Sequence, residues 1–214
     1  VMKNITYSDL KIKIIIVSAV ALLLFTVIVH SLDSPSERTN LCKLFRSHPT
    51  WYWSAQAAEK RWGVPVSVQM AIIYHESRFR ADAKPPHGRV MGVVPWARKS
   101  TAKGYMQALD KTWHAYLVAT KKRSASRSDF SNATDFIGWY VDRLHRTLKI
   151  SKHNVYALYL AYHEGPGGYL SHHYLAKPWL VALARTVQWR ANQYHKQLVS
   201  CHAQLPKRPW WRVW

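Results

Sequence analysis

The stretch VSVQMAIIYHE, residues 66–76, is an apolar run that ends in a carboxylate. The chain carries 31 Lys and Arg but only 11 Asp and Glu, so an acid in such a run stands out. Ile72 and Ile73 lie four and three residues before Glu76, which places the three side chains on one face of a helix. Glu76 is therefore expected to point toward the core at the C-terminal end of that helix.

Both surroundings would change the chemistry of Glu76. A low dielectric and the negative end of the helix dipole disfavour a charged carboxylate and raise its pKa. A carboxylic acid that stays protonated near neutral pH is what a general acid for glycoside cleavage requires. The alternative is a solvated glutamate at a helix end, paired with Arg78 or Arg80. The spacing alone leaves both interpretations open.

The rest of the chain is also dominated by helical signals. Apolar residues recur at the helical period, and capping residues and prolines mark helix starts. Helices are expected from Thr50 to Gly63, over 65–79, from Asp110 to about 120, over 134–149, from Asn154 to Gly165, and from Pro178 to about 198. No run alternates convincingly at period two, so the fold class is mainly α in one globular domain. Residues 84–104 are the exception, and they predict a short β-hairpin or a long loop after the Glu76 helix.

The N-terminal part differs in composition. Three lysines precede sixteen uncharged residues, 14–29, which would make about 24 Å of helix. The pattern predicts a transmembrane anchor over 14–32 after a cytoplasmic segment 1–13, with the domain outside the cytoplasm. The alternative is a signal peptide that is cut near Ser31.

The domain boundaries follow from the same composition. A polar linker is expected over 33–49, the domain over 50–201, and a basic, Trp-rich tail over 202–214. The two cysteines, Cys42 and Cys201, lie near the ends of the exported part. An oxidising compartment would let them pair, and the alternative is two unpaired thiols.

The formal net charge of +20 favours anionic partners: nucleic acid, anionic lipid or an anionic cell wall. The expected export argues against nucleic acid. A basic exported protein that only binds anionic surfaces remains one alternative, and it would show salt-sensitive binding without cleavage.

Three short motifs follow one another along the chain. They are HESRF around Glu76, GYMQ at 104–107 and AYHEGPG at 161–167. Taken together and in this order, they resemble the catalytic domain of the soluble lytic transglycosylases, the SLT type, which are relatives of goose-type lysozyme. The resemblance covers about residues 50–198 and implies a lysozyme-like fold.

The resemblance also implies roles for individual residues. Glu76 would be the only catalytic carboxylate, and Ser77 would help to hold the sugar near the reaction centre. Met106 and Gln107 would line the saccharide groove, and Tyr162 would support the wall of the active site.

Some positions depart from the family pattern. Tyr105 stands where the family has leucine and joins the candidate substrate-binding residues. His163 replaces an asparagine, and Glu164 replaces a small residue and adds a second acid. Trp189 stands where the family commonly has a tyrosine whose hydroxyl approaches the reacting sugar. Its indole could donate a hydrogen bond or stack on a sugar, and the alternative is packing at the rim.

The activity that the resemblance implies is non-hydrolytic cleavage of the β-1,4 bond between N-acetylmuramic acid (MurNAc) and N-acetylglucosamine (GlcNAc) in peptidoglycan, leaving a 1,6-anhydro end. No cofactor and no metal site are expected, and the partners would be glycan strands and the bacterial inner membrane, with the catalytic domain in the periplasm. Anchored members also suggest service to a secretion or conjugation machine. The alternatives are a lysozyme-type hydrolase, for which Glu164 is the candidate second carboxylate, and a non-catalytic wall-binding scaffold module.

Overall fold

The structure is a computed structural model that describes residues 15–21, 38–85, 87–90, 94–98 and 100–209. The chain divides into two units, Val1–Thr39 and Asn40–Trp214. In the first unit, residues 15–21 are helical. Apart from these, the expected anchor at 14–32 lies outside the described residues. Across the described ranges, no helix has the length and apolar character needed to cross a bilayer.

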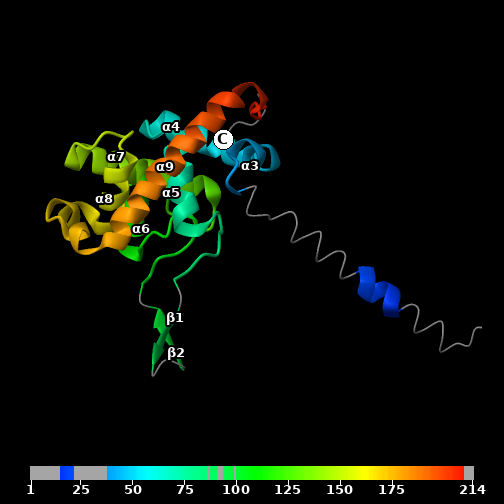
Figure 1. The fold of residues 1–214 in the computed structure, drawn as a ribbon, viewed down its shortest axis with the longest axis horizontal. Helices are drawn as coiled ribbons and strands as arrows, with labels where there is room; N and C mark the ends of the chain where they lie inside the picture. Colours follow the sequence, from blue (N-terminus) through cyan, green and yellow to red (C-terminus); the bar gives the residue numbers. More distant parts are fainter. Residues whose placement is uncertain (1–14, 22–37, 86, 91–93, 99, 210–214) are drawn as a thin grey trace, which may run out of the picture. The chain divides into compact units, whose positions relative to one another are not determined.

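The second unit is mainly helical, which confirms the expected fold class (Figure 1). Its α-helices are α3 (Leu41–Ser47), α4 (Pro49–Trp62), α5 (Val66–Ser77), α6 (Asp110–Thr120), α7 (Phe130–Leu148), α8 (Val155–Leu170) and α9 (Pro178–Ser200), and its 3-10 helices are η1 (His173–Ala176) and η2 (His202–Gln204). The starts of α6 and α9 and the Asn154 cap of α8 agree with the sequence analysis.

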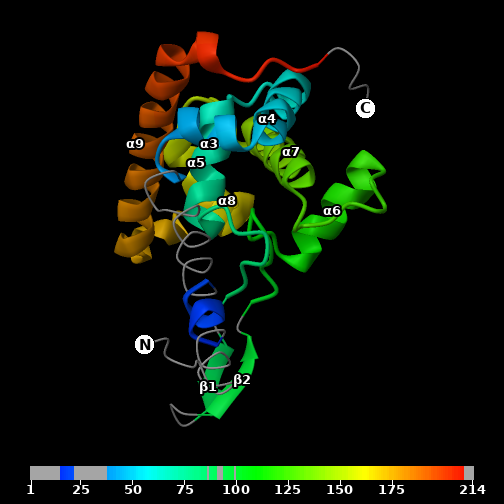
Figure 2. The ribbon, with the colours of Figure 1, turned by 90° about the vertical axis from the view of Figure 1, so that its right-hand side faces the viewer.

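Helix α5 lies at the centre of this unit. It has α9 on one side and α4 and α7 on the other (Figure 2). Ten of its twelve residues are buried, which explains why its sequence is apolar nearly all round rather than on one stripe. A helix surrounded in this way places its last turn inside the protein, and Glu76 lies on that turn.

The end of α5 is sharp. Arg78 and Phe79 follow it with φ angles of 54° and 60°, in the left-handed region that few non-glycine residues adopt. The Arg78 N–H donates to the carbonyl of Tyr74 and closes the last turn. The helix therefore ends two residues earlier than expected, and the chain turns away directly after Glu76 and Ser77.

The excursion after α5 contains two short strands. β1 (His87–Val90) and β2 (Val94–Arg98) pair antiparallel in a two-stranded sheet. The chain then returns through residues 100–109, where Lys103 and Ala108 form an isolated bridge. This returning segment matters because it reaches the end of α5.

A carboxylate joins α4, α6 and α7 away from that end. Asp135 accepts hydrogen bonds from the Trp62 indole at 2.8 Å, the Tyr116 hydroxyl at 2.7 Å and the Lys122 ammonium at 2.8 Å, and it also pairs with Arg61. Burial by itself raises the pKa of Asp135, but these donors outweigh it and lower the pKa. The charge of Asp135 is thus compensated, and its hydrogen bonds link the three helices to one another.

The two ends of the helical unit are tied together. Cys42 on α3 forms a disulfide with Cys201 at the end of α9, across 159 residues. Helix α3 occupies part of the expected linker 33–49, and the unit begins at Asn40 rather than at residue 50. The physical reason is a short apolar stripe, Leu41, Leu44 and Phe45, which is buried in the core. In the tail, the Trp53 indole donates to the Pro206 carbonyl at 2.8 Å.

Candidate active site

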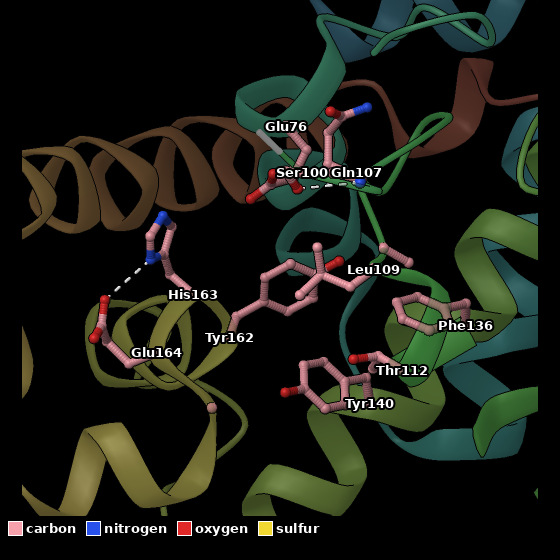
Figure 3. A pocket seen from close by; sticks show the side chains of 13 residues that line it. Glu76, Ser100, Gln107, Leu109, Thr112, Phe136, Tyr140, Tyr162, His163 and Glu164 are labelled. Atoms are coloured by element: carbon pink, nitrogen blue, oxygen red, sulfur yellow. Dashed lines mark hydrogen bonds and ion pairs between the residues drawn. The ribbon is translucent and has the colours of Figure 1, made fainter. Parts of the chain in front are cut away.

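A cavity of about 610 Å³ lies at the C-terminal end of α5. Glu76 lines it from α5, Gln107 and Leu109 from the returning segment, Tyr140 from α7, and Tyr162 from α8 (Figure 3). Five parts of the chain therefore meet here, since Thr112 of α6 also reaches the wall. A concave site that combines aromatic side chains, polar groups and acids with shifted pKa values is a usual form of a saccharide or small-ligand site.

Glu76 is the perturbed acid of this cavity. Desolvation raises its pKa from 4.5 to about 7, and a hydrogen bond with the Tyr159 hydroxyl acts in the opposite direction. The side chain keeps partial access to the cavity, but protein surrounds it closely enough for burial to dominate. Near neutral pH the group can therefore both give and take a proton.

Tyr159 and Tyr162 form the wall of α8 that faces Glu76. They lie three residues apart, so they share a helix face, and their rings are parallel with centroids 6.4 Å apart. The Tyr162 hydroxyl donates to the carbonyl of Met106 at 2.7 Å. Burial and the nearby Glu76 raise the pKa of both phenols, which keeps them neutral. This wall therefore offers Glu76 a hydroxyl but no positive charge.

Glu164 has the opposite surroundings in the same cavity. Its Oε1 accepts a hydrogen bond from the Lys177 ammonium at 2.7 Å and lies 3.1 Å from Nδ1 of His163. The hydrogen bond from Lys177 is the main cause of a lowered Glu164 pKa. Helix α8 is broken at Gly165, whose φ of 73° suits glycine, and the break follows directly after Glu164. Glu164 is thus an ionised carboxylate with its charge already compensated.

Gln107 lines the cavity from a backbone in the left-handed region, which few non-glycine residues adopt. Its φ is 47°, and its side-chain amide donates to the carbonyls of Ala83 at 2.9 Å and Gly104 at 2.8 Å. Gly104, with a φ of 78°, packs so closely that a Cβ there would collide with the Arg127 carbonyl. The GYMQ motif therefore fixes a turn that positions one polar side chain on the cavity wall.

Three other candidates do not line the cavity. The Ser77 hydroxyl is buried and donates to the Ile73 carbonyl at 3.2 Å. Met106 is fully buried, and it serves the site only through the carbonyl that supports Tyr162. Tyr105 is buried against the rings of Trp51 and Phe130. None of the three side chains is among the residues that line the cavity, and their contact with sugar stays a prediction.

Trp189 also lies away from Glu76. It is 53% exposed on α9, its ring lies 5.1 Å from the Arg190 guanidinium, and it lines a separate hollow with Gln188 and Asn192. The hydroxyl that hydrogen-bonds with Glu76 comes instead from Tyr159 on α8, which the sequence analysis missed. The available signal was the position of Tyr159 one helical turn before Tyr162.

The apolar part of the wall was also missed. Phe136 and Tyr140 lie four residues apart on α7 and line the cavity. The Tyr140 ring meets the Tyr162 ring edge to face, with centroids 5.3 Å apart. Aromatic and aliphatic groups of this kind suit the C–H faces of sugar rings. In the sequence, the two residues cannot be told apart from residues that fill the core.

The neighbour of Glu76 in the sequence is a histidine. Burial and the charges of Arg78 and Arg190 lower the pKa of His75 to about 4, so this neighbour of Glu76 is neutral. In the part of the chain that the structure describes, no three His, Cys, Asp or Glu side chains gather where they could hold a metal ion.

Comparison with known proteins identifies the family. The model of the transglycosylase SLT domain matches residues 16–201. Neither the curated proteins nor the solved structures compared with the chain gave a match. The match spans the three motifs and the cavity that they line, and it supports a peptidoglycan-acting function of the lytic transglycosylase type. The chain belongs to the transglycosylase SLT domain family.

Proposed function

We propose that the protein is a lytic transglycosylase that cleaves the MurNAc–GlcNAc β-1,4 bond without water and leaves a 1,6-anhydro-MurNAc end. The observation that carries this proposal is Glu76, a carboxyl whose pKa is raised to about 7 on the wall of a cavity large enough for sugars. General acids for glycoside cleavage need such a pKa.

The first step uses the protonated form of Glu76. Its carboxyl donates the proton to the glycosidic oxygen while the bond from that oxygen to C1 of MurNAc breaks. The GlcNAc side leaves as an alcohol, and C1 becomes oxocarbenium-like. Glu76 is then an anion in a poorly solvated site, which favours the return of a proton.

The second step restores the enzyme. The Glu76 carboxylate takes the proton from the C6 hydroxyl of MurNAc, and the C6 oxygen forms a bond to C1. One proton leaves Glu76 and one returns, and neither water nor a second carboxylate enters the balance. The tyrosine wall suits this cycle because Tyr159 can hydrogen-bond with Glu76 in either protonation state.

The hydrolase alternative is less well supported. A lysozyme-type reaction uses a second carboxylate about 5–9.5 Å from the acid, as nucleophile or as base for a water. Glu164 is the cavity's other acid, but Lys177 and His163 already compensate its charge. A wall-binding scaffold module would not need a carboxyl with a raised pKa.

The site of action is part of the proposal. Peptidoglycan lies outside the cytoplasm, and the lysines before residues 14–29 favour an anchored chain with its domain in the periplasm. A reporter fused after Trp214 should be active only outside the cytoplasm. Activity confined to the cytoplasm would contradict the proposed location, and with it any role beside a secretion or conjugation machine.

Mass spectrometry of digested sacculi tests the reaction itself. Purified sacculi treated with the protein should release muropeptides that are one water lighter than the hydrolytic products, as a 1,6-anhydro end requires. Reducing ends would identify a hydrolase, and no release above a Glu76→Gln control would identify a binding module.

A further inference from the structure

The N-terminal turn of α9 presents a large aromatic surface beside the cavity. Trp179 is 56% exposed, and its ring lies 5.2 Å from the ring of His163 at an interplanar angle of 77°. His163 is itself part of the cavity wall. An exposed indole in contact with a residue of a cavity wall offers that cavity an additional apolar surface for a ligand.

The position of Trp179 is fixed by its neighbours. Pro178 is the first residue of α9, which sets the direction of the helix. Lys177, one residue earlier, reaches Glu164 in the cavity wall at 2.7 Å. The contacts of Lys177 with Glu164 and of Trp179 with His163 therefore hold this turn against the cavity wall. The indole is both exposed and held in place, which lowers the entropy cost of binding a ligand.

We propose that Trp179 forms an additional saccharide subsite, beyond the His163–Glu164 wall, that stacks on a sugar ring remote from the bond being cut. This inference rests on the proposed function, because it extends the same glycan along the protein. The C–H face of a pyranose packs well on an indole, and no charge is needed for the contact. A remote contact of this kind favours long glycan strands over short fragments.

Trp189 supplies a matched control on the same helix. It is exposed to nearly the same degree, 53%, but it lies in a separate hollow that shares no residue with the Glu76 cavity. Its ring is next to Arg190 instead of a cavity residue. The two tryptophans therefore separate an effect of position beside the cavity from a general effect of exposed indoles.

Binding measured by calorimetry tests the subsite without relying on cleavage. The full chain carrying Glu76→Gln is titrated with β-1,4-linked GlcNAc oligomers of two and six sugars. Adding Trp179→Ala or Trp179→Leu should weaken the binding of the six-sugar ligand (the hexamer) by about fivefold or more. The binding of the two-sugar ligand (the dimer) should stay unchanged. Trp179→Phe should retain most of the affinity because it keeps an aromatic face. Trp189→Ala should leave the affinity for both ligands unchanged.

The outcomes separate this inference from the proposed reaction. Hexamer binding that is indifferent to Trp179, an equal loss for the dimer, or an equal loss in Trp189→Ala overturns the subsite even if the protein cleaves sacculi. Hexamer binding that depends on Trp179 supports the subsite even if cleavage fails. No hexamer binding by the Glu76→Gln chain overturns it as well.

Discussion

Glu76 and Glu164 lie on two walls of one cavity, and their surroundings shift their pKa values in opposite directions. At the end of α5, Glu76 is set among buried aromatic residues, and burial raises its pKa to about 7. At the break in α8, Glu164 faces Lys177 and His163, and these partners lower its pKa. A pair of acids whose surroundings push their pKa values apart assigns the acid and the anion of a site.

The difference is informative because cations are common in this chain. With 31 Lys and Arg in the sequence, a carboxylate would easily find a positive partner. The pKa of Glu76 is nevertheless set by desolvation and by the neutral hydroxyl of Tyr159. The neighbouring Arg78 and Arg190 act instead on His75 and on the ring of Tyr74. The surroundings of Glu76 thus favour its protonated form, whereas Lys177 and His163 favour the ionised form of Glu164.

Replacing Glu76 should have the largest effect. Glu76→Gln keeps the shape of the side chain and removes the transferable proton, so release of fragments from sacculi should fall by about a thousandfold. The assay is the initial rate of solubilisation, with circular dichroism as the control for folding. A rate close to that of the unaltered protein would mean that the comparison has identified the wrong acid.

The raised pKa should also appear in stability. Above pH 7 the folded state holds an ionised, poorly solvated Glu76, whereas below pH 4.5 the group is protonated in both the folded and unfolded states. The free energy of unfolding should therefore fall as pH rises from about 4.5 to about 7, by at most about 3 kcal/mol. Because Glu76 is partly exposed, screening by solvent should make the observed value smaller than this limit.

Glu76→Gln isolates that contribution from other titrating groups. Denaturant midpoints measured between pH 4 and 8 should show that the variant gains stability relative to the unaltered protein as pH rises. Parallel curves for the two proteins would show that the pKa of Glu76 is not raised.

Glu164 should matter much less than Glu76. If it neither attacks the sugar nor activates a water, Glu164→Gln should reduce cleavage by less than about tenfold and leave the 1,6-anhydro product unchanged. A loss as deep as that of Glu76→Gln, or reducing ends in the product, would favour the hydrolase instead.

Replacing Tyr159 should have the smallest effect on the rate, and it tests what sets the pKa of Glu76. Its hydrogen bond lowers the pKa of Glu76, so Tyr159→Phe should raise that pKa further. The alkaline limb of the pH–rate profile should therefore move to higher pH. The rate at the optimum should change little, which separates this effect from loss of the acid. A movement of the alkaline limb to lower pH would contradict the role given to the Tyr159 hydroxyl.

The helices and the acid could be predicted because their signals are local. Pro178 and Asn154 mark helix starts by chemistry that depends on a few neighbouring residues. Glu76 follows an apolar run whose length already indicates a buried helix. Helix α3 was missed because only three apolar residues carry its pattern, and they are buried through contacts with distant segments.

The partners of the acid could not be predicted in the same way. Tyr159 lies 83 residues from Glu76, and their contact depends on how α8 packs against the end of α5. Two tryptophans on α9 show the same limit, since only Trp179 contacts a residue of the cavity wall while the family pattern directed attention to Trp189. Helical spacing gives the face of a residue, but tertiary packing decides which cavity that face meets.

The central claim is that Glu76 and Glu164 differ in protonation within one cavity. Carbon-detected NMR of the side-chain carboxyls, assigned with the Glu76→Gln and Glu164→Gln variants, measures both pKa values in one titration. Glu76 should titrate at about pH 7, and Glu164 should titrate below the usual value of 4.5. A Glu76 signal that titrates at or below the Glu164 signal would contradict the account.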